Sequence, residues 1–231
     1  MIRQPQQWPT TNQMGRLQIE LSNYCNAKCP ECERAYRPEE LNNTNLTLEE
    51  IKKTFIPGQW DSCDTIHFCG NVDEPTINPE IYEITKYFHM LPKNKATVQI
   101  STNGGTRDEK FWREMGELSL SWPGDIGDRQ HLEVIFAIDG LKDTNHMYRI
   151  GVHWDRLVNN YKAYIKAGGN ATWQFIVFPW NKHQIQEAEK LAYNEGFTQF
   201  LVTENYRVND RSQFNYESRY YDTMWSLPFE I

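Results

Sequence analysis

The segment RLQIELSNYCNAKCPEC, residues 16–32, joins an alternating pattern to three closely spaced cysteines. Residues 16–22 alternate apolar and polar side chains, which predicts a β-strand. The loop that follows holds Cys25, Cys29 and Cys32 in the spacing C-x3-C-x2-C. Three thiols are an unusual number, because a structural zinc ion takes four ligands and disulfides take pairs.

Strand and helix patterns alternate downstream of this segment. Short apolar runs predict strands, and helical periodicity with terminal capping signals predicts helices between them. Further strands are predicted at residues 65–70, 96–102, 131–138, 171–178 and 198–203. Helices are predicted at residues 46–55, 78–91, 107–118, 155–168 and 181–196. Regular β–α alternation implies an α/β fold with a parallel sheet, either doubly wound or closed into a complete or partial barrel.

Two of the predicted helices carry specific start signals. Thr47 and Glu50 have the spacing of a capping box, which predicts a helix that begins after Thr47. Asn78 followed by Pro79 predicts an N-cap and the first helical position of the next helix.

Polar and glycine-rich segments follow the first four predicted strands. They are the cysteine loop, GNVDEP at residues 70–75, NGG at 103–105 and DG at 139–140. The carboxyl ends of parallel strands lie at one edge of the sheet, and α/β folds bind ligands there. We therefore expect these four segments to converge on one binding site.

Composition excludes several classes of protein and partner. The formal net charge of −7 argues against non-specific binding to nucleic acid, which needs basic surface. No apolar run approaches the ~20 residues of a membrane-spanning helix, and the first residues lack the apolar core of a secretory signal. The five cysteines are an odd count, so we interpret them as metal-binding or catalytic thiols in a reducing cytoplasm.

The chain divides into three parts by pattern. Residues 1–15 are a polar N-terminal extension, and residues 16–203 hold the alternating strands and helices of one domain. Residues 204–231 are rich in aromatic side chains without a clear period, and we expect this tail to pack on the core domain.

Two kinds of metal site suit the three clustered thiols. A zinc ion would need a fourth ligand, for which Cys63, His67 and Cys69 are the nearest candidates. A [4Fe–4S] cluster normally binds one cysteine thiolate to each of its four irons, so three thiolates leave one iron open for a substrate or cofactor. In the second interpretation, three ligands are a requirement rather than a shortfall.

Four motifs together resemble the radical S-adenosylmethionine (SAM) superfamily. The C-x3-C-x2-C loop after the first strand is similar to its signature, residues 70–75 resemble its G-x-x-E-P segment, and STNGG at residues 101–105 resembles its T-N-G turn. AIDG…HMYRIG at residues 137–151 is similar to a segment of the peptide- and protein-modifying (SPASM-like) branch. The resemblance covers roughly residues 16–203 and implies a partial (β/α)6 TIM-type barrel with parallel strands.

The resemblance also implies chemistry and site residues. Family members use a [4Fe–4S] cluster to cleave SAM to a 5′-deoxyadenosyl radical, which abstracts hydrogen from a substrate. It implies cluster ligands at Cys25, Cys29 and Cys32, and SAM-binding residues at Gly70, Asn71, Asp73, Glu74, Asn103, Asp139, Arg149 and Gln174. Four of these have a plain alternative: Glu74 as part of a turn before a helix, Asn103 as part of an Asn-Gly turn, Arg149 as a solvated helix residue, and Gln174 as an outward-facing strand residue.

The chain also departs from the family pattern. Glu31 stands before the third cysteine, where an aromatic residue is common, and Val72 and Asp73 replace glycines of the second motif. Arg34 is expected to balance charge at an anionic cluster. The sequence holds no cysteine after Cys69, so we expect a single cluster without the auxiliary clusters of the SPASM-like branch.

The implied function is that of a radical SAM enzyme, an oxidoreductase acting on a peptide or protein. Its expected partners are that substrate and an external electron donor such as flavodoxin or ferredoxin. Association with a membrane is not expected. No catalytic side chain is assigned. The alternative is a cluster- or zinc-binding α/β scaffold protein without catalysis.

Overall fold

Six parallel strands form one sheet in the computed structural model, which describes residues 15–36, 41, 43–56, 63–90, 96–121 and 131–205. The strands are β1 (Arg16–Ile19), β2 (Thr65–Phe68), β3 (Thr97–Thr102), β4 (Leu132–Ala137), β5 (Asn170–Val177) and β6 (Gln199–Glu204). They lie in the order β1-β2-β3-β4-β5-β6, each beside its neighbours in sequence. A doubly wound sheet reverses its strand order at a switch point, so this order is that of a partial barrel.

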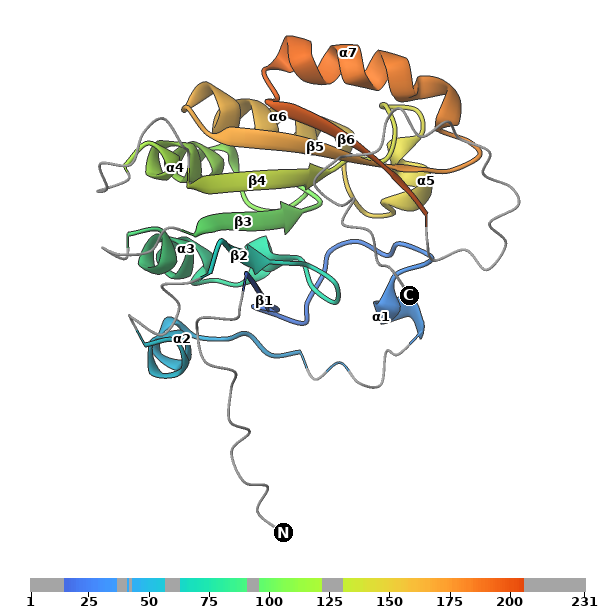
Figure 1. Ribbon diagram of the computed structural model, residues 1–231. Coiled ribbons are helices and arrows are strands. Elements are labelled where there is room, and N and C mark those ends of the chain that lie inside the picture. The colour runs from blue at the N-terminus through green and yellow to red at the C-terminus, as the bar shows by residue number, and fades with distance from the viewer. Residues whose placement is uncertain are drawn as a thin grey trace.

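Helices connect successive strands and cover the outer face of the sheet (Figure 1). The longer ones are α2 (Leu48–Thr54), α3 (Ile81–His89), α4 (Glu109–Ser119), α6 (Trp154–Lys166) and α7 (Ile185–Glu195). Four short ones are α1 (Glu33–Tyr36), α5 (Asn145–Tyr148), and the 3-10 turns η3 (Pro75–Ile77) and η4 (Lys182–Gln184). In Figure 1 the arrowheads of β3 and β4 point toward the side of the molecule that carries α1 and α5.

The predicted β–α alternation is confirmed, and one helix start is wrong. The Thr47–Glu50 capping box forms, since Thr47 Oγ1 accepts the Glu50 N–H at 3.2 Å and Glu50 Oε2 accepts the Thr47 N–H at 2.8 Å. The helix predicted to begin after Asn78 begins instead at Ile81. The Asn78 Oδ1 accepts the Glu80 N–H at 2.8 Å in the turn before the helix, and its Nδ2 donates to the carbonyls of Leu21 and Leu46 at 2.8 Å each.

The core between the sheet and the helices is aromatic. Buried rings from α4, β4, α6, β5 and the segment before β6 contact one another, and they are Trp112, Phe136, Tyr161, Tyr164, Trp173 and Phe197. Helices α4 and α6 approach closely at Gly116, where a Cβ atom would clash with the Tyr164 carbonyl oxygen and lie 2.7 Å from the Ala167 Cβ. This packing holds the strands whose carboxyl ends carry the site.

The inner face of the sheet is polar. Arg16 Nη2 donates to His67 Nδ1 at 2.7 Å, and Gln99 Nε2 donates to Glu133 Oε2 at 2.7 Å. The hydroxyl of Thr172 donates to the other oxygen of Glu133. These bonds connect β1 to β2, and β4 to both β3 and β5. They pair the polar groups on the inner face of the sheet, as buried polar atoms require.

Two predicted segments lie mainly outside the described residues. They are the N-terminal extension, of which residues 1–14 are not described, and the aromatic tail, of which residues 206–231 are not described. The proposal that the tail packs on the core therefore stays a prediction.

Candidate active site

A cavity of about 940 Å³ opens at the carboxyl ends of the strands. Nearly all of the site residues predicted from sequence line it, namely Cys25, Cys29, Cys32, Gly70, Asn71, Asp73, Glu74, Asn103, Arg149 and Gln174. The exception is Asp139, which is fully buried and does not line the cavity. Three of the four polar segments that follow the first four strands thus line one cavity, as the parallel topology predicts, whereas the DG segment at residues 139–140 does not line it.

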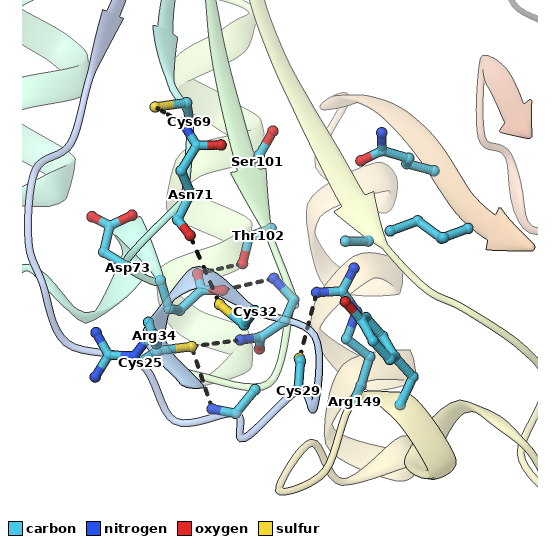
Figure 2. A pocket seen from close by; sticks show the side chains of 18 of the residues that line it. Cys25, Cys29, Cys32, Arg34, Cys69, Asn71, Asp73, Ser101, Thr102 and Arg149 are labelled. Atoms are coloured by element: carbon cyan, nitrogen blue, oxygen red, sulfur yellow. Dashed lines mark hydrogen bonds between the residues drawn. The ribbon is translucent and has the colours of Figure 1, made fainter. Parts of the chain in front are cut away.

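The three thiols of the cysteine loop face this cavity (Figure 2). Arg34 holds the loop in place, because its Nη1 donates to the carbonyls of Asn23 and Val72 and so joins the cysteine loop to the loop after β2. Burial raises the pKa of Cys25 to about 12 and also raises the pKa of Cys29. Thiolates are disfavoured at these positions unless a positively charged group binds them, which suits a metal-containing cluster.

The alternative zinc ligands do not join the cysteine loop. Cys63 precedes β2 and Cys69 follows it, so a span of six residues, about 20 Å of extended chain, separates Cys63 from the cavity end. Cys69 Sγ donates to Glu20 Oε1 at 2.8 Å, and His67 is bonded to Arg16 and Ser101.

Within the described ranges, no three or more His, Cys, Asp or Glu side chains are placed to hold one metal ion. A [4Fe–4S] cluster binds its cysteines through separate irons, so it does not need the sulfurs gathered around a single ion. The donor set therefore fits the cluster better than it fits zinc.

Glu74 joins the loop after β2 to the loop after β3. The side chain is 2% exposed, and burial raises its pKa. Its Oε1 accepts the hydroxyls of Thr76 and Thr102 at 2.6 Å each, and its Oε2 accepts the Asn103 N–H at 2.6 Å. The carboxylate expected at the SAM amino group is therefore engaged inside the protein. Of the carbonyls of residues 70–73, that of Asn71 accepts the Cys32 thiol and that of Val72 accepts Arg34, so those of Gly70 and Asp73 are the candidates for a cationic ligand.

Glu20 does not line the cavity, but it holds the loop after β2, and it was not predicted from the sequence. It follows β1, and its carboxylate accepts the Cys69 thiol and the backbone N–H groups of Asn71 and Val72 at 2.8, 3.2 and 3.3 Å. Burial and the neighbouring Glu20 raise the pKa of Asp73 to about 9. An acidic residue at the carboxyl end of the first strand was the available signal.

Asn103 ties the turn after β3 to the cysteine loop. Its Nδ2 donates to Asn26 Oδ1 at 2.8 Å and lies 3.8 Å from Cys25 Sγ, while its Oδ1 accepts the Gly105 N–H at 2.8 Å. The side chain thus holds the first thiol in position from the neighbouring loop.

Arg149 is not a solvated helix residue. Its side chain is 15% exposed and its Nε donates to Asp139 Oδ2 at 2.6 Å. Asp139 is fully buried, and its other oxygen accepts the Ile176 N–H at 2.7 Å. Burial opposes the charge of Arg149, but Asp139 outweighs that effect and raises the pKa of Arg149. Asp139 therefore positions Arg149 rather than lining the cavity itself.

The inner wall of the cavity carries neutral hydrogen-bonding groups. Gln174 lines it and does not face outward, because its neighbours Trp173 and Phe175 fill the opposite, buried face of β5. His67 accepts from Arg16 at Nδ1, so its Nε2–H donates to Ser101 Oγ at 2.8 Å. The Ser101 hydroxyl hydrogen is then available to a ligand in the cavity.

Glu31 does not line the cavity, although it precedes the third cysteine. Its carboxylate accepts the side-chain amide of Asn205, the last described residue of the chain, which does line the cavity. The position where an aromatic residue is common therefore connects the cysteine loop to the end of β6.

Comparison with known proteins gives one family. The model of the radical SAM superfamily matches residues 19–192. No curated protein matches the chain. No helix in the described segments combines the length and the apolar character needed to cross a bilayer.

Several solved structures share the fold. Streptococcus suis SuiB bound to S-adenosylmethionine is 16% identical over 87% of this chain and 41% of its own, with a TM-score of 0.63. Native anSMEcpe with bound AdoMet and Cp18Cys peptide is 15% identical over 82% of this chain and 50% of its own, with a TM-score of 0.57. Methylornithine synthase (PylB) is 16% identical over 84% and 54%, with a TM-score of 0.55. This chain thus spans about half the length of these proteins or less.

The family model covers most of the chain and includes the cysteine loop and the polar loops after β2, β3 and β4. Membership implies a [4Fe–4S] cluster and SAM as cofactors, which agrees with three cavity-facing thiols and no zinc geometry in the described part. The chain belongs to the radical SAM superfamily.

Proposed function

We propose that this chain cleaves SAM reductively at a [4Fe–4S] cluster held by Cys25, Cys29 and Cys32, and that the 5′-deoxyadenosyl radical so formed abstracts hydrogen from a peptide or protein. The observation that carries the proposal is the meeting of these three thiols with the GNVDEP and TNG loops around one cavity. The cavity of about 940 Å³ lies at the upper end of the size range of small-molecule sites.

A fourth thiol at the cavity, that of Cys69, is engaged by other groups, and this supports a cluster with one iron left open. Cys69 Sγ is bonded to Glu20, and Asn71 lies between Cys69 and the cysteine loop, since its Nδ2 donates to Cys69 Sγ at 3.4 Å and its carbonyl accepts the Cys32 thiol at 3.8 Å. Figure 2 draws Cys69 and the three loop cysteines on opposite sides of Asn71. We assign the open coordination position to SAM.

The proposed contacts to SAM follow from the groups left unengaged at the cavity. The carbonyls of Gly70 and Asp73 receive the amino group, because backbone acceptors complement an ammonium. Arg149 bonds Asp139 through Nε, and its remaining guanidinium edge suits the SAM carboxylate. Gln174, level with Ala137 in the sheet, suits the ribose hydroxyls.

A peptide or protein substrate is the finer part of the proposal. The AIDG…HMYR segment is similar to that of peptide-modifying family members, and two of the structural neighbours were solved with peptides: SuiB with the precursor peptide SuiA, and anSMEcpe with the Kp18Cys and Cp18Cys peptides. The neutral hydroxyl of Ser101 on the cavity wall suits the amides of a peptide. We further propose an external electron donor such as flavodoxin or ferredoxin, and the reducing cytoplasm as the setting.

The test is SAM cleavage by the full chain after anaerobic reconstitution. With dithionite as reductant, we expect a brown protein with about four irons and the formation of 5′-deoxyadenosine. An intact cluster that binds SAM without any cleavage would refute the enzymatic proposal. Stoichiometric zinc without iron, even under anaerobic handling, would identify a zinc-bound scaffold instead. Transfer of deuterium from labelled candidate peptides into 5′-deoxyadenosine would identify the substrate.

A further inference from the structure

The guanidinium of Arg149 lies beside a proposed cluster ligand. Its Nη1 is 3.9 Å from Cys29 Sγ, although the two residues are 120 positions apart. The backbone brings them together, because Lys28 N–H donates to the Ile150 carbonyl at 2.8 Å. Gly151 permits this approach, since a Cβ atom there would lie 2.8 Å from the Asn26 carbonyl oxygen.

Asp139 prevents Arg149 from turning toward solvent. Its Oδ2 accepts Arg149 Nε, and Asp139 itself is held by the Ile176 N–H and by Asn145 Oδ1, which accepts the Asp139 N–H at 2.9 Å. The guanidinium carbon also lies 5.3 Å from the centre of the Tyr148 ring. The positive charge therefore has a fixed place next to the Cys29 sulfur.

A fixed cation at a ligand sulfur has a redox consequence. Reduction of an iron–sulfur cluster adds one negative charge, and hydrogen bonds to the sulfurs together with nearby charge set the reduction potential. A buried guanidinium is screened little by salt, so it stabilises the reduced state more than a surface arginine does. The group also acts without SAM, because it reaches the cluster through the protein ligand.

We propose that Arg149 raises the reduction potential of the cluster through Cys29, and that Asp139 is the positioning residue that fixes Arg149 there. The proposal rests on the proposed function, because it needs the cluster at Cys25, Cys29 and Cys32. It goes beyond a contact to SAM, since it assigns Arg149 a role in accepting the electron.

The experiment is a potentiometric titration of the reconstituted full chain without SAM, followed by the electron paramagnetic resonance signal of the reduced cluster. We expect Arg149→Met to shift the midpoint potential to more negative values. Arg149→Lys keeps the charge and should stay closer to wild type than Arg149→Met does. The matched control is Arg156→Met on the exposed face of α6, which should leave the potential unchanged.

A double variant separates the redox role from an unpaired buried carboxylate. The double variant Asp139→Asn with Arg149→Met removes both charges. It should therefore lower the reduction potential only if the contact between Arg149 and Cys29 affects the cluster. Wild-type potentials in both Arg149→Met and the double variant, with full cluster content, would overturn the proposal even if SAM affinity falls. Cluster uptake by the wild type is measured first, so failure of the proposed function itself is recognised separately.

Discussion

The carboxylate of Glu74 accepts the backbone N–H of Asn103 at 2.6 Å, although the residues lie 29 positions apart. The same carboxylate accepts hydroxyls of Thr76 and Thr102, so every group around it is a donor. An ionised carboxylate, which only accepts, matches this surrounding, and an amide does not. Glu74 thus holds two ligand-binding loops in register.

Glu74→Gln should therefore destabilise the fold although it preserves shape. The amide nitrogen would face a donor, and we expect a loss of about 2–4 kcal/mol in the free energy of unfolding. Urea denaturation of the apo protein measures this loss. Glu83→Gln on the exposed face of α3 is the control and should change the free energy of unfolding by less than about 0.5 kcal/mol. Equal stability of the two variants would contradict the role of Glu74.

Single cysteine substitutions should divide the five cysteines into two groups. Replacing Cys25, Cys29 or Cys32 by Ala should abolish the reconstituted cluster, because each holds one iron. Cys63→Ala and Cys69→Ala should keep the iron and sulfide content of the wild type, since neither belongs to the proposed ligand set. Colorimetric iron and sulfide assays check both groups. Loss of iron in Cys69→Ala would show that the open iron has been assigned wrongly.

Stability should fall in mild acid because of His67. Burial and the neighbouring Arg16 lower its pKa to about 4, whereas an unfolded histidine titrates near 6.5. Between these pH values the unfolded state thus binds more protons than the folded state. The contribution of His67 to the free energy of unfolding is therefore fully present above pH ~6.5 and declines as the pH falls toward ~4.

Thermal denaturation from pH 7.5 to 4.5 measures the slope. His67→Gln retains a hydrogen-bonding side chain but cannot titrate, so its curve should be flatter than that of the wild type in this window. Parallel curves for the two proteins would exclude His67 as the source. His183, which is exposed beside α7, provides the control, and His183→Gln should leave the slope unchanged.

Gly116→Ala should destabilise the fold although it increases helix propensity. Alanine favours a helix over glycine by about 1 kcal/mol, but a methyl group here clashes with the Tyr164 carbonyl where α4 meets α6. Overpacking costs about 1–3 kcal/mol, so a net loss is expected. Urea denaturation checks it against Arg113→Ala on the exposed face of α4. A net gain in stability would mean that the two helices can separate without cost.

Local patterns predicted those features that depend on neighbouring residues. The strands follow from short apolar or alternating runs, three of which end in a glycine-containing segment, and the start of α2 follows from Thr47 and Glu50, whose bonds are local. The meeting of the cysteine loop with residues 70–75 follows from parallel topology alone, because strand ends share an edge.

Features that depend on distant partners were not predictable in this way. Asn78 has the residue type of an N-cap and its Oδ1 accepts the Glu80 N–H, but its Nδ2 also bonds the distant carbonyls of Leu21 and Leu46, and the helix starts at Ile81. The role of Glu20 depends on Cys69, 49 positions away. No local pattern could decide whether Arg149 is solvated, because burial by tertiary packing decides it.

The bond between Glu31 and Asn205 joins residues that are 174 positions apart. During synthesis the cysteine loop leaves the ribosome long before Asn205, whose side-chain amide bonds Glu31. We therefore expect the three thiols to reach their final arrangement only after β6 has been translated and docked. We expect cluster retention to depend on β6, so that a chain truncated before this strand retains less iron than the full chain does.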